Sequence, residues 1–284
     1  LIKKAINQCK ELLKKEKPDV VIGVGGYVTF PVLKAASSMG IKTFIHEQNS
    51  IPGKSNKMIS KYADLIGITF EESEKYFKTK GKIIYTGHPC GPWALEIPKK
   101  DKEELGFTKG KKLVTFVSGS LGSGSINGKM QKFLENAGSK KYEICYITGK
   151  GHYDSFIEGK KYPENVKIFP YMEELPGLLK VSDLVVSRAG AGSLTEIIAL
   201  QIPSIIIPSP NVANNHQYYN AKSLADKKCI HLLEEKDIEA EKLEQIIDKI
   251  LNNSKLRMDM RIQMKKMQKE NSSQIIYEAI KEML

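Results

Sequence analysis

Two loops of glycine and small hydroxyl side chains have the composition of phosphate-binding loops. They span residues 118–125 and 187–196, and each follows an apolar run and precedes a segment with helical spacing. Small side chains let backbone N–H groups approach a phosphate at a helix N-terminus, where the helix dipole favours negative charge. Neither loop has the spacing of a P-loop or of GxGxxG. A structural turn explains each loop alone as well as phosphate binding does.

A carboxylate and a cluster of amides are suited to recognising hydroxyl groups. Glu196 falls in the first turn of a helix expected over residues 193–200, where a carboxylate can accept hydrogen bonds from two ribose hydroxyls or simply oppose the helix dipole. Residues 211–220 follow an apolar strand and carry mostly amide, imidazole or phenol side chains. Asparagine is common in turns, but Gln217 and Asn220 fall inside the next helix. Their position favours a polyhydroxylated ligand.

A third polar group, His46-Glu47-Gln48-Asn49, ends another apolar strand. These side chains suit acid–base chemistry or hydroxyl recognition. A metal site would need a second histidine close by, and His88 is the only other histidine in residues 1–92, so metal binding is disfavoured. The four cysteines lie far apart without a CxxC pair, which excludes zinc-finger, iron–sulfur and disulfide scaffolds and fits a reducing compartment.

Strands and helices alternate along the chain and must position these groups. Nearly all-apolar strands separated by helical segments predict an α/β fold with parallel sheets covered on both faces. The pattern restarts near Trp93, which predicts two Rossmann-like domains facing a cleft, with ligands at the carboxyl ends of the strands. The expected strands are residues 19–24, 43–46, 64–69, 82–86, 112–117, 142–147, 166–169, 183–186, 204–207 and 229–233, and the last helices are 239–251 and 255–284.

The net charge of +11 is concentrated at the start of the chain, where residues 1–92 hold 15 Lys or Arg against 8 Asp or Glu. A solvated lysine-rich surface or an anionic partner accounts for this excess. A single tryptophan and the lack of an Arg-rich tract disfavour nucleic acid. Residues 1–17 combine lysines with an apolar stripe, which is typical of a helix at a membrane interface and equally of one that covers a sheet. The longest apolar run, residues 20–33, is too short to cross a bilayer.

The motifs in chain order are Gly25-Gly26-Tyr27-Val28-Thr29-Phe30-Pro31, His46-Glu47-Gln48-Asn49, residues 118–123, Pro170-Tyr171-Met172, residues 188–196 and residues 214–221. Together they closely resemble those of the MurG family. MurG enzymes are peripheral membrane N-acetylglucosaminyltransferases that convert lipid I to lipid II in peptidoglycan synthesis. The resemblance runs from about residue 18 to residue 225, and the His-Glu-Gln-Asn motif and residues 214–221 are its most specific parts.

The resemblance implies an inverting GT-B glycosyltransferase that moves N-acetylglucosamine from UDP-N-acetylglucosamine to the 4-hydroxyl of undecaprenyl-pyrophosphoryl-N-acetylmuramyl-pentapeptide. It implies a role in cell wall biogenesis, cell shape and cell division at the cytoplasmic face of the cell membrane. The implied partners include an anionic membrane surface but no nucleic acid, and no metal or cofactor is implied. Three parts of the chain are implied. Residues 1–92 form an incomplete domain on the acceptor and membrane side, and residues 93–265 form the domain that binds the UDP-sugar. Residues 266–284 form a helix that packs back on the first domain.

The family's site residues carry over to matching positions of this sequence. Ser120 would meet the diphosphate, Glu196 the ribose hydroxyls and the backbone of Met172 the uracil. The residues implied to cradle phosphate at the helix start are Ala191, Gly192, Ser193, Leu194 and Thr195. The residues implied to hold the sugar are His216, Gln217 and Asn220, with Asn49 reaching the donor from the first domain. The candidate acceptor-side contacts are His46 and Glu47.

The sequence departs from the family at two places. The family begins with a strand and a glycine-rich loop whose histidine is a candidate general base, and this sequence starts after that segment. The catalytic base is therefore unassigned, and we expect this chain alone to be inactive. A phosphate-contacting arginine that the family places after a Gly-Asn-Pro turn has no counterpart in Gly87-His88-Pro89-Cys90-Gly91.

Two other functions fit the same motifs. One is another GT-B enzyme, such as a diacylglycerol glycosyltransferase, and the other is a fragment that binds UDP-sugar without turnover. A dinucleotide oxidoreductase is disfavoured because neither glycine loop has the required spacing or the acidic residue that should follow.

Overall fold

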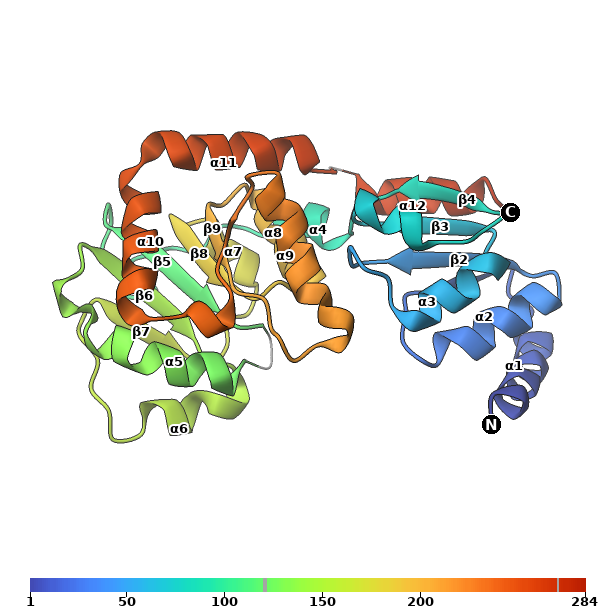
Figure 1. Cartoon of the computed structure of the whole chain (residues 1–284), viewed down its shortest axis with the longest axis horizontal. Helices are drawn as coiled ribbons and strands as arrows, with labels where there is room; N and C mark the ends of the chain where they lie inside the picture. The colour runs from blue at the N-terminus through green and yellow to red at the C-terminus, as the bar shows by residue number, and fades with distance from the viewer. Residues whose placement is uncertain (120–121, 270) are drawn as a thin grey trace. The chain divides into compact units, whose positions relative to one another are not determined.

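The computed structural model describes residues 1–119, 122–269 and 271–284. The chain forms two compact units (Figure 1). Unit 1 comprises Leu1–Pro92 and Lys269–Leu284, and unit 2 comprises Trp93–Gln268. Unit 1 is therefore built from both ends of the chain.

Within the described residues, unit 1 contains a four-stranded parallel sheet in which the strands follow chain order. Its strands are β1 (Val20–Gly23), β2 (Lys42–Glu47), β3 (Leu65–Ile68) and β4 (Lys82–Tyr85). Its helices are α1 (Ile2–Glu16), α2 (Thr29–Ser38), α3 (Lys54–Ile59), η1 (Ser60–Tyr62), η2 (Glu71–Tyr76) and α12 (Ser272–Lys281). The core lies between the sheet and α2 and α3, where Leu33, Ile45 and Ile66 are buried.

Unit 2 contains a six-stranded parallel sheet, counted over the part of the chain that the structure describes, with strand order β10-β9-β8-β5-β6-β7. Its strands are β5 (Lys112–Val117), β6 (Tyr142–Ile147), β7 (Val166–Phe169), β8 (Leu184–Ser187), β9 (Ser204–Ile206) and β10 (His231–Leu232). The chain runs outward from β5 to β7 and then crosses back to β8 beside β5. Ligands of such sheets bind where the order reverses, which here is the carboxyl end of β5 and β8.

The other elements of unit 2 are helices. They are α4 (Cys90–Glu96), which begins before the boundary between the units, α5 (Gly124–Glu135), η3 (Ala137–Ser139), η4 (Lys150–His152), α6 (Tyr153–Ile157), α7 (Leu175–Leu179), α8 (Ala191–Leu200), η5 (Ala213–Asn215), α9 (His216–Asp226), η6 (Glu235–Asp237), α10 (Ala240–Asn252) and α11 (Ser254–Met267). The expected α/β architecture of two parallel-sheet domains is confirmed.

Both sheets fix strand register with an aspartate placed just before a strand. Asp64, before β3, accepts hydrogen bonds at 2.8 Å from both the backbone N–H and the hydroxyl of Thr43 in β2. Asp183, before β8, accepts one at 2.8 Å from the backbone N–H of Leu113 in β5. Each carboxylate satisfies a donor at the start of a neighbouring strand that the ladder leaves unpaired.

The prediction of a single helix over residues 255–284 is wrong, because this segment forms two helices. The helix α11 ends at Met267, and Gln268 is extended with φ −63° and ψ 133°. The segment from Gln268 to Ser273 has no apolar side chain that would hold a continuous helix against a core. The second helix, α12, belongs to unit 1, where Lys269 lies 4.4 Å from the ring centre of Tyr85.

Two short helices were not expected. The helix α4 occupies a stretch read as turn residues, and α6 lies in a polar segment with weak periodicity. Across the described ranges, no helix combines the length and apolar character needed to span a membrane.

Candidate functional site

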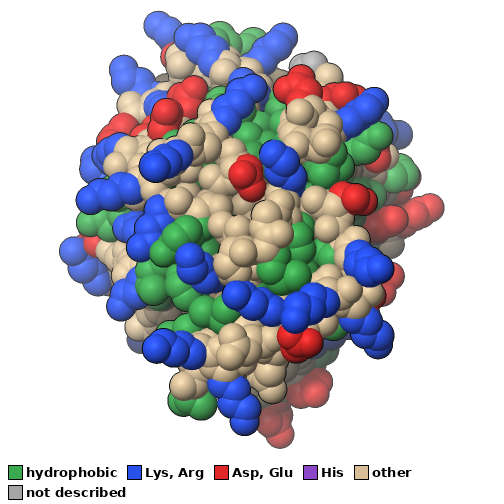
Figure 2. All heavy atoms as spheres, turned by 90° about the vertical axis from the view of Figure 1, so that its right-hand side faces the viewer, with side chains coloured by type: hydrophobic (Ala, Val, Ile, Leu, Met, Phe, Trp, Pro, Cys, Tyr) green, Lys and Arg blue, Asp and Glu red, His purple; other side chains and the backbone are tan. Residues whose placement is uncertain are grey.

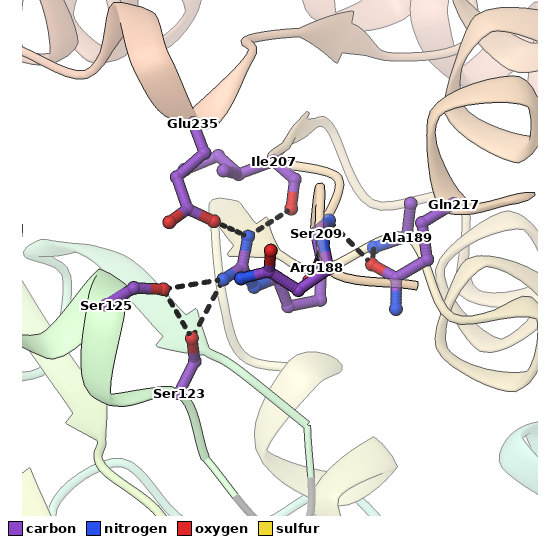
Figure 3. A network of polar contacts seen from close by, with 9 residues as sticks. Ser123, Ser125, Arg188, Ala189, Ile207, Ser209, Gln217 and Glu235 are labelled. Atoms are coloured by element: carbon purple, nitrogen blue, oxygen red, sulfur yellow. Dashed lines mark hydrogen bonds and ion pairs between the residues drawn. The ribbon is translucent and has the colours of Figure 1, made fainter. Parts of the chain in front are cut away.

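The loops after β5 and β8 are joined by a buried arginine (Figure 3). Arg188, directly after β8, is 7% exposed, and its Nη1 lies 2.6 Å from the Oε2 of Glu235. The same nitrogen donates to the carbonyl of Ile207 at 3.3 Å. The other terminal nitrogen, Nη2, donates to the hydroxyls of Ser123 at 2.8 Å and Ser125 at 3.4 Å. One guanidinium therefore ties together the loop after β5, the end of β8, the end of β9 and η6.

Close contact between the backbones of Gly122 and Thr148 also fixes the loop after β5. Gly122 has φ +73°, and a Cβ placed there would lie 2.0 Å from the carbonyl oxygen of Thr148 at the end of β6. Only glycine fits this position, because any side chain would collide with backbone. Ser120, which the sequence assigns to the diphosphate, lies outside the described residues.

A cavity of about 370 Å³ opens at this end of the sheet within unit 2. Its walls come from the ends of β5 and β6, from the segment before α7 and from the start of α8. The lining residues are Trp93, Val117, Gly119, Ile147, Tyr171, Met172, Glu174, Leu175, Pro176, Gly190, Gly192, Ser193 and Glu196. The structure thus brings Met172, Gly192, Ser193 and Glu196 together, as expected of a donor site, in a cavity of ligand size.

The start of α8 presents backbone donors to this cavity. Gly190 is the N-cap residue, and no side chain caps the helix. The first N–H used within the helix is that of Leu194, which donates to the carbonyl of Gly190 at 2.9 Å. The hydroxyl of Thr195 donates to the carbonyl of Ala191 at 2.8 Å instead of capping the helix.

The predicted phosphate cradle is therefore narrower than residues 191–195. Leu194 has its side chain fully buried and its N–H already bonded, so it supplies packing and no donor. The N–H groups of Ala191, Gly192 and Ser193 precede the first bonded turn. These three are the donors that geometry offers to an anion.

Glu196 is the half-buried carboxylate of the cavity. Burial raises the pKa of this carboxyl from 4.5 to about 7. Among the described residues, no hydrogen bond or ion pair to its carboxylate is found, so desolvation is uncompensated. A ligand that donates hydroxyl hydrogen bonds would supply the missing partners.

The polar cluster at α9 divides into inward and outward groups. The Oε1 of Gln217 accepts the backbone N–H groups of Ser209 at 2.9 Å and Ala189 at 3.3 Å. Its amide nitrogen points away from both (Figure 3), and Gln217 is not among the residues that line the cavity. Asn220 is fully buried and donates to the carbonyl of Ala189 at 3.3 Å, so it braces the loop after β8 instead of facing a sugar. His216 donates its Nδ1–H to the carbonyl of Ala213 at 2.9 Å, which leaves Nε2 as its acceptor.

The polar motif of unit 1 is turned into the protein. Glu47 is 2% exposed, and its Oε1 accepts the backbone N–H of Asn49 at 2.9 Å and the Asn49 side-chain amide at 3.3 Å. Its Oε2 accepts the side-chain amide of Asn56 at 2.8 Å and the backbone N–H of Gly53 at 3.3 Å. The carboxylate therefore orients Asn49 and shapes the loop after β2, and its burial does not support an acceptor-side contact.

His46 is likewise a buried structural group. Its Nε2 lies 3.0 Å from the carbonyl of Gly87, which only accepts, so Nε2 carries the proton. Its Nδ1 accepts from the amide of Gln48 at 3.2 Å. Burial lowers the pKa of His46. The ring centre of His88 lies 5.8 Å from that of His46, and burial lowers the pKa of His88 to about 4. With both nitrogens bonded, His46 is not available as an acceptor contact or general base.

The comparisons with known proteins agree with this arrangement. The glycosyltransferase family 28 C-terminal domain matches residues 113–279, and the family 28 N-terminal domain matches residues 1–68. A relative from Bacillus cytotoxicus, named UDP-N-acetylglucosamine–N-acetylmuramyl-(pentapeptide) pyrophosphoryl-undecaprenol N-acetylglucosamine transferase, is 41% identical over 99% of this chain and 78% of its own length. This chain belongs to the MurG family.

Other relatives and solved structures support membership of the MurG family. A transferase of the same name from Caldanaerobacter subterraneus is 41% identical over 96% of this chain and 77% of its own length. The crystal structure of Acinetobacter baumannii MurG superposes with a TM-score of 0.80, 26% identity and coverage of 99% of this chain and 78% of that one. A Listeria monocytogenes protein described as a UDP-N-acetylglucosamine 2-epimerase shares the fold alone, with a TM-score of 0.73 at 15% identity and coverage of 99% and 78%.

In this MurG-family chain, the sequence alone did not reveal that Glu235 is the partner of Arg188. Glu235 lies in a charged Glu-Glu-Lys-Asp run that reads as a solvated surface. No local spacing connects it to the loop after β8, and only the arginine at the end of an apolar strand hinted at a buried anion. Among the described residues, no group of three or more His, Cys, Asp or Glu side chains forms a candidate metal site.

Removing the buried arginine should destabilise unit 2 strongly. Arg188→Met leaves the Glu235 carboxylate buried without its cation, and we expect a loss of about 3–5 kcal/mol in unfolding free energy. The double variant Arg188→Met/Glu235→Gln should recover a large part of this loss. Urea unfolding followed by circular dichroism measures both variants. A loss below about 1 kcal/mol for Arg188→Met would show that the ion pair is not needed.

Nucleotide binding should depend on pH through Glu196. The folded-state pKa near 7 lies above 4.5, so the carboxyl is protonated below about pH 7 and cannot accept from two hydroxyls. We expect the affinity for UDP to rise about tenfold between about pH 6 and pH 8. Glu196→Gln should abolish this rise in UDP affinity and leave only the change caused by titration of the phosphate itself. Calorimetric titrations of both proteins across this range measure it, and identical pH profiles would contradict the assignment.

Proposed function

We propose that this chain binds UDP-N-acetylglucosamine in unit 2 and functions in transfer of its N-acetylglucosamine to lipid I, the reaction for which its relatives are named. The observation that carries the proposal is the placement of Glu196 beside the uncapped start of α8 in one cavity. A carboxylate for a diol and helix-start donors for a diphosphate are complementary to a sugar nucleotide.

The chemistry follows from where charge develops. Transfer breaks the bond between the anomeric carbon and the diphosphate, and negative charge builds on the departing UDP. Backbone N–H groups at the start of α8 are fixed before the reaction, so they stabilise this charge without rearrangement. The acceptor 4-hydroxyl attacks from the opposite face, which inverts the anomeric configuration and requires a base aligned with the hydroxyl.

Gln217 supplies selectivity for the sugar in this proposal. Its carbonyl oxygen is committed to two backbone N–H groups, which locks the rotamer. The amide nitrogen is thereby held in one direction, as a donor to a hydroxyl or acetamido oxygen of N-acetylglucosamine. A donor held in place costs less conformational entropy on binding than a freely rotating one.

Unit 1 is proposed to meet an anionic membrane surface through α1, placing the chain at the cytoplasmic face of the cell membrane. The inward side of α1 packs Leu13 against Ala35 and Ala36 of α2. A different set, including Leu12 at 53% exposure, faces outward among the lysines of the helix. Figure 2 shows a face on which Lys and Arg side chains surround hydrophobic ones. The helix therefore covers α2 and still leaves apolar and cationic groups for an interface.

Donor binding tests the proposed function. Glu196→Ala should weaken both UDP and UDP-N-acetylglucosamine about tenfold or more, because two hydrogen bonds to the ribose are lost. Gln217→Glu keeps the oxygen that Ala189 and Ser209 require but removes the amide donor. It should therefore lower the ratio of UDP-N-acetylglucosamine affinity to UDP affinity. Calorimetry supplies the affinities.

The acceptor is tested separately, with the family's first strand and glycine-rich loop placed ahead of residue 1, by transfer of labelled N-acetylglucosamine to lipid I in competition with diacylglycerol. Label on diacylglycerol would replace the lipid I assignment. Absence of binding to either nucleotide by the folded chain would contradict the proposed donor site.

Membrane association should depend on the exposed lysines of α1. Each lysine near an anionic surface contributes about 1 kcal/mol, so Lys4→Glu/Lys15→Glu should weaken binding to phosphatidylglycerol-containing vesicles about tenfold or more. Lys160→Glu/Lys161→Glu makes the same charge change in unit 2 and is the matched control. Vesicle co-sedimentation measures both variants. Equal loss in the two would show that only net charge matters.

A further inference from the structure

Trp93, the only tryptophan of the chain, lines the cavity that contains Glu196. The motifs that describe donor binding do not include it. Its side chain is 46% exposed, although tryptophan is among the side chains that proteins bury most extensively. A large aromatic surface left open on the wall of a cavity is characteristic of a ligand contact.

The backbone around Trp93 is anchored firmly to unit 2. Lys180, at the end of α7, donates to the carbonyl of Leu95 at 2.8 Å. The backbone N–H of Lys100 donates to the carbonyl of Gly177 at 3.0 Å. A Cβ on Gly177 would lie 2.5 Å from the carbonyl oxygen of Pro98, so α7 and this segment are in direct backbone contact. The indole is thus held on a rigid support, as a binding wall must be.

The support places the indole among the apolar walls of the cavity. The residues Tyr171 and Met172 lead into α7, and Leu175 and Pro176 of α7 line the same cavity. One more aromatic ring, Tyr171, is fixed by Lys150, whose Nζ lies 4.5 Å from the ring centre. The N–H groups available to an anion come from another element, the start of α8. The cavity therefore has an aromatic region, a carboxylate and an anion-binding region, which match the base, ribose and diphosphate of one nucleotide.

We propose that Trp93 is a wall of the nucleoside subsite and packs against the uridine portion of the donor. This inference rests on the proposed function and assigns a further specificity residue to it. The indole face excludes water from one side of the nucleoside and gains area and π-contact with it, without reading any single hydrogen-bonding group.

Intrinsic fluorescence tests this directly, because all tryptophan emission comes from Trp93. UDP and uridine should each change the emission of the wild-type chain in a saturable way, whereas N-acetylglucosamine 1-phosphate should not. Loss of base–aromatic contact weakens binding about 5- to 100-fold in other proteins, and we expect about tenfold weaker UDP binding for Trp93→Ala by calorimetry. Trp93→Phe keeps an aromatic wall and should retain most of the affinity.

Leu95→Ala, on the same helix but outside the cavity lining, is the matched control and should bind UDP like wild type. Thermal unfolding of each variant confirms that it is folded. Unchanged UDP affinity in folded Trp93→Ala, or a fluorescence response to the sugar phosphate but not to uridine, would overturn the inference while leaving donor binding intact. Failure of the wild-type chain to bind UDP would instead overturn the proposed function, and this inference with it.

Discussion

The buried pair of Arg188 and Glu235 is the interaction on which the loops of unit 2 depend. A parallel sheet whose strand order reverses leaves loops that have no ladder to hold them together. The arginine spans this gap because its planar fork offers several donors at fixed angles. It satisfies a carbonyl, two hydroxyls and a carboxylate at once. An apolar side chain of the same volume would fill the space but leave those groups unpaired.

The polar residues of the sequence motifs have two kinds of role in the two units. Glu196 and the amide nitrogen of Gln217 are kept open, and their unmet hydrogen-bonding capacity is what a ligand can use. Asn220 and Glu47 look equally functional as residue types, yet Asn220 is hydrogen-bonded to a backbone carbonyl, and Glu47 to backbone N–H groups and to the side-chain amides of Asn49 and Asn56. The buried, hydrogen-bonded polar residues hold in place the loops that carry the open ones. Both are needed for a site in which the binding groups are fixed before the ligand arrives.

The sequence predicted the fold more completely than the site. The apolar runs predicted the bounds of β5 and β6 to the residue, because buried strands leave a strong local pattern. The helix α4 was missed because Gly91 and Pro92 signal a turn, and its retention depends on contacts with α7 that are distant in sequence. Local pattern also cannot say whether a polar side chain faces a cavity or a backbone carbonyl. That choice separated Glu196, which lines the cavity, from Asn220, and it concealed the partner of Arg188.

The division of unit 1 between the two ends of the chain has a consequence for biosynthesis. Unit 2 is continuous from Trp93 to Gln268, so all of its strands leave the ribosome together and can close their core as they emerge. The sheet of unit 1 is synthesised before unit 2, whereas α12 is synthesised after it. The surface beside Gly87 and Tyr85 that Lys269 and Ser272 cover must therefore wait, solvent-exposed, while the whole of unit 2 is made. Unit 1 is therefore completed only after unit 2 has been synthesised.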